Sequence, residues 1–153
     1  MTNELEKLAS KANMDFRKQN KALVLKVPTP IMNTAKGLVA QQSTVDYTGL
    51  LVGGRYLAFD AKECRSRTSF PLQNIHQHQL LYLQLVKQLG GLAFFLVWFK
   101  EINDKVYVTP LSLVEKYWDG NIRKSIPIEE FDDAWLTDIS TYIDKVIEMQ
   151  NEL

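Results

Sequence analysis

The 153-residue sequence predicts an α/β fold in which helices flank a mixed central sheet. Apolar residues recur at helical spacing in several segments, alternating or continuous apolar runs lie between these segments, and turn-forming residues separate them. The longest apolar run, Leu92 to Phe99, has the length of a buried central strand. With 46% hydrophobic residues, the chain suits a single domain, residues 1–153, that can bury a sizeable core.

The N-terminal half predicts a helix, a strand and then a hairpin. The helix is expected at about 3–20, because Leu5, Ala9, Ala12 and Phe16 share one face. A strand over 22–27 follows, and the turn-prone Pro28-Thr29-Pro30 opens a segment to residue 42 that is expected to be irregular. Strands at about 45–52 and 56–63 are expected to pair through the turn at Gly53-Gly54.

A second helix is expected at about 73–89. Its predicted stripe contains one polar residue, Gln79, among Ile75, Tyr82, Val86 and Leu89. A buried amide must find a hydrogen-bonding partner. Gln79 therefore contacts a metal ion or a carboxylate, or it is a satisfied core glutamine, or the helix begins later.

The C-terminal half predicts two more strands and two more helices. The strands are expected at 91–100 and 105–109, joined by a turn over 102–105. The helices are expected at about 110–118 and 138–150.

Two acids and a lysine fall on the predicted hairpin. Asp46 lies on its first strand, and Asp60 and Lys62 share one face of its second strand, because strand side chains alternate between faces. If the strands pair as their turn implies, the two carboxylates converge within reach of one cation and Lys62 stands beside them. Hard cations such as Mg²⁺ prefer oxygen ligands of this kind. The alternative is that all three are solvated charges on an exposed sheet face.

This residue set matches the requirements of phosphodiester cleavage. The reaction needs a water made nucleophilic near neutral pH and needs stabilisation of negative charge on the phosphoryl oxygens. A metal held by carboxylates can supply both, and a neighbouring lysine can stabilise the charge or orient and deprotonate the water. The pattern therefore predicts a metal-dependent nuclease.

Charge is segregated along the chain although the net charge is zero. Residues 1–67 contain eleven Lys/Arg and six Asp/Glu, whereas residues 68–153 contain seven and twelve. Cations around a site suit a polyanionic substrate such as DNA, although solvated faces have a similar composition. The cations expected to contact DNA are Lys36, Arg55, Arg65 and Arg67.

Several classes of protein are not expected. The longest apolar run is too short to cross a bilayer, and the N-terminus lacks an apolar signal core, so no membrane association is predicted and the protein is expected in the cytoplasm. The single cysteine, Cys64, excludes an internal disulfide and any cysteine-based zinc site.

Five sequence segments resemble the RecU family of Holliday junction resolvases. KVPTPI, STVDY, GRYLAFDAKE, TSFPLQNIHQHQ and RKSI occur in the family's order, and the similarity covers nearly the whole chain. The resemblance implies a nuclease core of the restriction-endonuclease type, denoted PD-(D/E)xK, and a homodimer. It also implies that Mg²⁺, for which Mn²⁺ can substitute, is needed to cut paired strands of a four-way DNA junction.

Carried over by motif, the resemblance assigns roles to individual residues. Thr44, Asp46, Asp60 and Gln79 are expected to surround the metal, and Lys62 to stabilise the transition state. Asp60 stands where family members commonly carry glutamate, a change that keeps the charge. Glu6 resembles an acidic position that this nuclease superfamily often uses, or it is a surface charge.

One segment departs from the family. Between Pro30 and Ser43 the chain has only IMNTAKGLVAQQ, about half of the family's stalk, with Lys36 as its only cation. The shortened stalk, at about 31–42, affects the expected junction selectivity more than the expected catalysis. It suits a phage-encoded relative, which would act in the host cytoplasm.

Two alternatives to a junction resolvase remain at this point. One is a nuclease for flaps, forks or duplex DNA. The other is a non-cleaving protein that binds junctions or modulates a recombinase, against which the intact set of two acids and a lysine argues.

Overall fold

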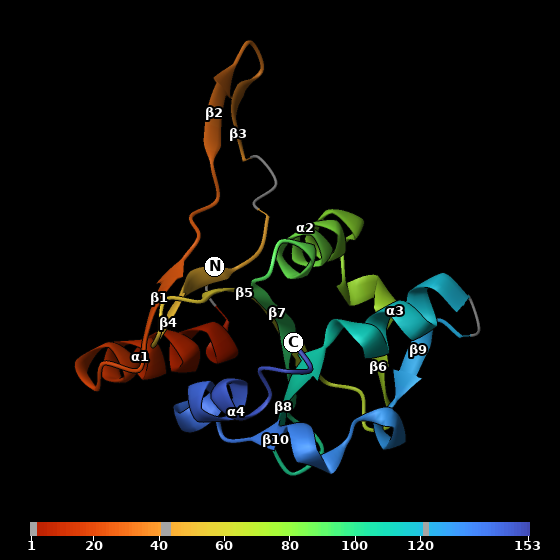
Figure 1. The fold of residues 1–153 in the computed structure, drawn as a ribbon. Helices are drawn as coiled ribbons and strands as arrows, with labels where there is room; N and C mark the ends of the chain where they lie inside the picture. The colour runs from red at the N-terminus through yellow and green to blue at the C-terminus, as the bar shows by residue number, and fades with distance from the viewer. Residues whose placement is uncertain (1–2, 41–43, 121–122) are drawn as a thin grey trace.

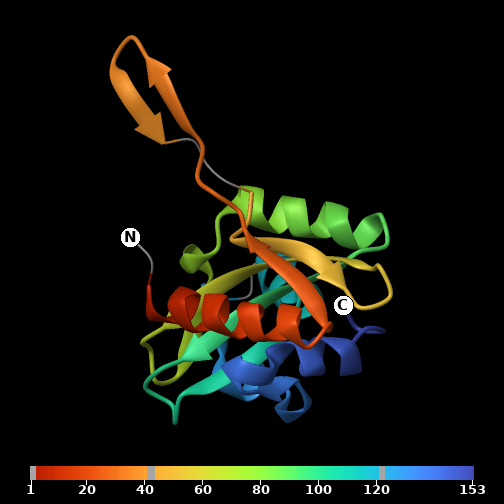
Figure 2. The same cartoon turned by 90° about the vertical axis from the view of Figure 1, so that its left-hand side faces the viewer.

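The computed structural model describes residues 3–40, 44–120 and 123–153. At its centre lies a six-stranded mixed sheet in the order β1-β4-β5-β7-β8-β10. Helices α1 and α4 cover one face and α2 and α3 the other (Figures 1 and 2), which confirms the expected α/β arrangement. The sheet strands are β1 (Ala22–Lys26), β4 (Tyr47–Leu51), β5 (Tyr56–Cys64), β7 (Leu92–Phe99), β8 (Lys105–Pro110) and β10 (Leu136–Thr137). The helices are α1 (Glu4–Lys18), α2 (Gln77–Gln88), α3 (Leu111–Gly120) and α4 (Tyr142–Glu148).

The first helix begins at a capping box. The Asn3 side chain accepts from the Glu6 backbone N–H at 2.8 Å, and the Glu6 carboxylate accepts from the Asn3 N–H at 3.3 Å. These bonds satisfy donors that a helix start otherwise leaves unpaired. The apolar face predicted for this helix is buried against the sheet.

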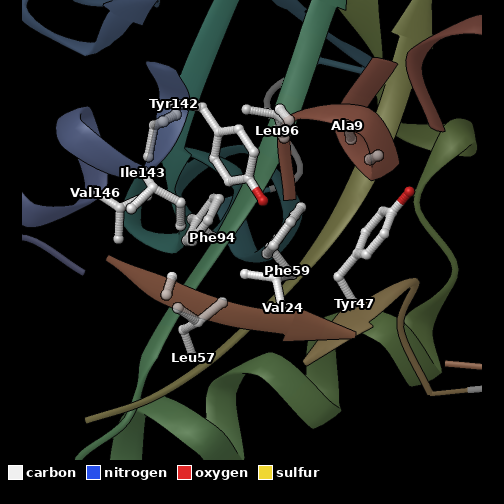
Figure 3. Close-up of a cluster of buried hydrophobic side chains, with 14 of the residues drawn as sticks. Ala9, Val24, Tyr47, Leu57, Phe59, Phe94, Leu96, Tyr142, Ile143 and Val146 are labelled. Atoms are coloured by element: carbon white, nitrogen blue, oxygen red, sulfur yellow. The ribbon is translucent and has the colours of Figure 1, made fainter. Parts of the chain in front are cut away.

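An aromatic stack fixes the register of the central strands. Phe59 of β5 lies opposite Tyr47 of β4 and Phe94 of β7, with ring centroids 4.9 Å and 4.7 Å away. Figure 3 shows these rings in the core beneath α1 and α4, together with Tyr142. A slip of one residue would turn these rings to the other face of the sheet, so their burial specifies one pairing.

Both faces of β5 are covered. Leu57, Phe59 and Ala61 join the core beneath α1 and α4, whereas Ala58 and Cys64 join the core beneath α2 and α3. Asp60 lies on the second face and is only 1% exposed. The alternative that this face is an open, solvated surface is therefore wrong for Asp60.

The segment after β1 was expected to be irregular, and this prediction is wrong for residues 31–40. Strands β2 (Ile31–Thr34) and β3 (Gly37–Ala40) pair in an antiparallel hairpin that projects away from the sheet (Figure 1). Every β2 residue is exposed, so the sequence lacks the alternation of buried and exposed positions that predicts a strand. Residues 41 and 42 of the predicted segment lie outside the described residues.

The predicted stripe on the second helix is partly wrong: Ile75 and Val86 are buried as expected, but the bounds of the helix and the burial of Leu89 are not as expected. The helix begins at Gln77 rather than at residue 73, after the short 3₁₀ helix η1 (Leu72–Asn74). Its buried face contains Leu80, Leu83 and Val86, whereas Leu89 is 78% exposed. The later start was one of the alternatives. It places Gln79 in the first turn of the helix, where it is half-buried and lies on the same face as Leu83 and Val86.

The remaining elements are close to their expected positions. The strands predicted at 91–100 and 105–109 and the helix predicted at 110–118 correspond to β7, β8 and α3, while α4 is shorter than expected. The two-stranded pair β6 (Ser69–Pro71) and β9 (Ser125–Pro127) was not predicted, because strands of three residues are too short to show a period. No helix among the described residues has the length and apolar content to cross a bilayer.

Candidate active site

A polar cavity of about 540 Å³ lies at the junction of α1, the β4–β5 pair and the start of α2. Two carboxylates and a lysine from the predicted set line it, together with Glu6 and Gln79. The full lining consists of Asn3, Glu6, Asp46, Asp60, Ala61, Lys62, Glu63, Gln73, Asn74, His76 and Gln79.

The register of β4 and β5 brings the two aspartates together. Tyr47 pairs with Phe59, so Asp46, which precedes Tyr47, meets Asp60, which follows Phe59. Asp60 Oδ1 accepts from the Asp46 backbone N–H at 2.9 Å, and Asp46 Oδ2 accepts from the Ala61 N–H at 2.9 Å. Each carboxylate is thus held by the backbone of the other strand.

Lys62 neutralises part of this negative charge. Its Nζ lies 2.8 Å from Asp60 Oδ2 and donates to Gln79 Oε1 at 2.9 Å. Asp60 and Lys62 share a face of β5, as the alternation predicted. Both side chains are largely buried, so solvent screens their attraction less than it would at the surface.

Asp46 has a strongly shifted protonation equilibrium. Burial, followed by repulsion from the Asp60 carboxylate, raises the pKa of Asp46 from 3.8 to about 7, and Glu6 adds a smaller repulsion. The hydrogen bond from the Ala61 N–H opposes this shift. The cavity therefore holds more negative charge than its protein cations neutralise, and a proton or another cation relieves the repulsion.

Glu6 points into the site from α1. Its Oε2 lies 3.2 Å from Lys26 Nζ, and its backbone oxygen accepts from the Tyr47 hydroxyl at 3.1 Å. These contacts tie the first turn of α1 to β1 and β4. The alternative that Glu6 is an ordinary surface charge is wrong, because its side chain is only 13% exposed and lines the cavity.

Gln79 joins the start of α2 to β5. Its Oε1 accepts from Lys62 Nζ and from the His76 backbone N–H at 3.0 Å. The partners of the amide oxygen are thus the Lys62 ammonium, which also pairs with Asp60, and a backbone N–H, rather than the carboxylate that one alternative expected. His76 is exposed and lines the cavity.

Other predicted residues lie apart from the cavity lining. Thr44 is exposed, two residues before Asp46, and is not among the described lining residues. Arg55 lies at the far end of the β4–β5 pair, where its Nε donates to the Gly90 carbonyl at 3.1 Å. Arg67 pairs with Glu101 at 3.7 Å, Arg65 is exposed, and Lys36 lies in the turn of the β2–β3 hairpin.

The sequence did not single out several lining residues. Glu63 accepts from the Leu5 N–H at 2.8 Å and so anchors the start of α1, while Gln73 and Asn74 come from η1. Glu63 faces away from Asp60 and Lys62 in the strand alternation, so only the position of α1 reveals its contact. Within the described residues, no three His, Cys, Asp or Glu side chains form a group suited to a metal.

The fold and the site together define a mixed α/β protein in which a polar cavity holds paired carboxylates and a lysine. The chain belongs to the RecU family, since residues 2–151 match the family model described as Recombination protein U. This finding confirms the resemblance that the sequence motifs indicated.

Curated relatives agree with this assignment. The chain is 37% identical over 141 residues to Holliday junction resolvase RecU of Staphylococcus epidermidis, a match that covers 82% of this chain and 67% of the relative. The protein of the same name from Staphylococcus carnosus gives the same identity and coverage. That from Oenococcus oeni is 35% identical over 138 residues, covering 80% of this chain and 69% of the relative.

Proposed function

We propose that this chain is a Holliday junction resolvase, a metal-dependent endonuclease that cuts paired strands of a four-way DNA junction. The observation that carries the proposal is the convergence of Asp46, Asp60 and Lys62 in one polar cavity of a RecU-family chain. Relatives that share more than a third of their aligned residues with it are named Holliday junction resolvases.

We further propose that the core is of the PD-(D/E)xK type. The supporting arrangement is an acid before β4, followed on β5 by the sequence Asp60-Ala61-Lys62, with the two strands paired antiparallel. Helices lie on both faces of the sheet, and Glu6 supplies a further acid from the first helix.

The donor set fits a hard divalent cation such as Mg²⁺, for which Mn²⁺ would substitute. Asp46 and Asp60 would hold it, because burial and mutual repulsion leave these carboxylates in need of positive charge. Two carboxylates are enough for Mg²⁺, which usually keeps several water ligands. Gln79 would contribute a neutral oxygen, and Thr44 would do so only after its exposed side chain turned towards the site. When bound, the cation would make a water nucleophilic and polarise the phosphoryl group.

The protein's own residues would position and stabilise the reacting groups. An ammonium has three donors, and Lys62 directs two of them at Asp60 and Gln79. The third would donate to a phosphoryl oxygen or to the attacking water. The backbone N–H groups of Asp46 and Ala61 hold the two carboxylates in place, so little reorganisation accompanies the reaction.

The expected DNA contacts surround the cavity at a distance. Arg65 and Arg67 follow the C-terminal end of β5, beyond Lys62, and Lys36 would meet DNA at the tip of the projecting hairpin. Arg55 lies at the opposite end of β5, so it would contact a more distant part of the substrate.

We propose a homodimer for the same function. A four-way junction presents two equivalent strands, which two symmetry-related sites can cut. On the face of the sheet that α2 also covers, β1 and β4 present three exposed apolar side chains, Leu23, Leu25 and Leu50. Leu23 lies directly opposite Leu50 in the strand pairing. A second copy would cover this surface. Light scattering should report a dimer for the wild type and a monomer for a Leu25→Lys variant, whereas a dimeric variant would exclude this surface.

Asparagine at position 60 tests whether this cavity performs the cleavage. Asp60→Asn should abolish cutting of a labelled four-way junction in Mg²⁺, while binding to the same junction in EDTA persists. Asp15→Asn, which changes an exposed aspartate on α1, is the matched control and should cut normally. Retained cleavage by Asp60→Asn would remove Asp60 from the active site.

A further inference from the structure

A second cavity lies beside the candidate active site. It has a volume of about 470 Å³ and lies between the β6–β9 pair and the C-terminal end of α3. Its lining is more apolar than polar and also holds two cations and several polar side chains. The lining residues are Ser69, Pro71, Leu72, Gln73, Ile75, Tyr117, Trp118, Arg123, Lys124 and Ser125. This volume falls in the range of about 300–1,000 Å³ that is usual for small-molecule pockets.

We propose that this cavity binds one unpaired nucleotide of the DNA substrate. The base would lie against Trp118, and an adjoining phosphate would contact Arg123 and Lys124. The proposal rests on the proposed nuclease function, because it assigns the cavity to the same DNA strand that enters the active site.

The two cavities share a wall. Gln73 of η1 lines both cavities. Of the other two η1 residues, Asn74 lines the candidate active site and Leu72 lines the second cavity. A strand that occupies the active site therefore needs to pass only one short 3₁₀ helix to reach the second cavity. This proximity favours a DNA chain as the occupant over an unrelated small molecule.

Trp118 is placed to contact a planar ligand. The neighbouring Tyr117 also lines the cavity, but it is only 5% exposed and its hydroxyl donates to the Glu130 carboxylate at 3.0 Å, so it offers little surface to a ligand. Trp118 is only partly buried and lines the cavity. A base inside duplex DNA has both faces covered by its neighbours, so an aromatic side chain of this kind contacts bases that are unpaired or unstacked.

Two adjacent cations complete the nucleotide site. Arg123 and Lys124 are exposed, and among the described residues neither forms an ion pair with an acid. They stand out because residues 68–153 carry more acids than bases. The Lys124 carbonyl accepts from the Leu72 N–H at 2.9 Å, which ties this basic segment to the wall between the cavities.

Binding to a short single-stranded oligothymidylate tests the proposal directly. In EDTA, where no cleavage occurs, Trp118→Ala should weaken binding about tenfold, the size expected when one stacking contact is lost. Trp118→Phe should retain most of the affinity, since it keeps an aromatic face. An equal affinity for Trp118→Ala and the wild type would overturn the proposal.

The charge contribution has its own matched control. Lys124→Gln should lower the salt dependence of oligothymidylate binding by about one phosphate contact. As the control, Lys105→Gln removes a cation from β8. Lys105 lines a separate cavity together with the acids Glu129, Asp132 and Asp133, so this change should leave the salt dependence unchanged. The same salt dependence for Lys124→Gln and the wild type would contradict the phosphate contact.

Tryptophan fluorescence separates stacking from a general loss of folding. The chain has three tryptophans, of which Trp98 is 7% exposed. Oligothymidylate should quench the wild type and should quench Trp118→Phe much less, while the fluorescence of the unbound variant still reports a folded core. Equal quenching in both proteins would place the bound base elsewhere.

The cavity proposal and the nuclease proposal can fail separately. If the wild type cuts junctions but Trp118→Ala binds oligothymidylate normally, only the second cavity loses its assignment. If the wild type cuts no DNA but Trp118→Ala still loses binding and quenching, the nucleotide site stands and the nuclease function falls.

Discussion

Replacing Asp46 with asparagine should stabilise the metal-free protein, and the gain should grow with pH. The pKa of this carboxyl rises from 3.8 to about 7 on folding. Because the folded protein prefers the protonated form, stability is lost as pH rises from the unfolded pKa to the folded pKa, and the loss is complete above about 7. Asparagine keeps the acceptor for the Ala61 N–H and removes the charge.

The size of the Asp46 pKa shift sets the expected gain in stability. A difference of about three pKa units corresponds to about 4 kcal/mol at about 1.4 kcal/mol per unit, so Asp46→Asn should gain about 4 kcal/mol at pH 8. At pH 5 the native carboxyl is still protonated, and the gain should fall to about 2 kcal/mol. A gain in stability on Asp46→Asn would be unusual, because most substitutions of buried residues lower the free energy of unfolding.

Urea unfolding in EDTA at pH 5 and pH 8 measures both gains. Asp15→Asn, at an exposed position on α1, is the control and should change stability little at either pH. A gain for Asp46→Asn that is the same at both pH values, or a loss of stability at pH 8, would refute the electrostatic account of the paired carboxylates.

Three further predictions concern the metal, the lysine and the backbone near the site. The Mg²⁺ concentration that half-saturates thermal stabilisation should fall as pH rises from 6 to 8, because the cation competes with the Asp46 proton; a flat dependence would contradict this competition. Lys62→Met should lower the single-turnover cleavage rate on saturating junction DNA by about 10²–10³-fold, and an unchanged rate would exclude Lys62 from the reaction. Gly49→Ala should destabilise the fold by about 2 kcal/mol or more in urea, because its Cβ would lie 2.1 Å from the Leu23 carbonyl oxygen; an unchanged unfolding midpoint would show that β1 can move aside.

Local patterns predicted the centre of the site well. Asp60 and Lys62 lie two residues apart on one strand, so their shared face follows from the strand period alone. The glycine pair at 53 and 54 predicted the turn that sets the register, and that register brings Asp46 to Asp60. These predictions succeeded because every step depends on residues that are close in sequence.

Features that depend on distant contacts or on exposure could not be predicted in the same way. Glu6 reaches the cavity because α1 packs across β1 and β5, and only the family resemblance suggested its role. The β2–β3 hairpin buries no β2 residue, so it shows no apolar alternation. The second helix begins after His76, which is not among the usual N-cap residues, so the start of the helix was placed too early.

The most direct test of the account compares a labelled four-way junction with a linear duplex of matched sequence, each with Mg²⁺ and with EDTA, on a denaturing gel. A junction resolvase should make symmetric cuts in the junction that require Mg²⁺ and should leave the linear duplex intact. Cutting of both DNAs would contradict junction selectivity, and the absence of any cut with Mg²⁺ would contradict the nuclease function itself.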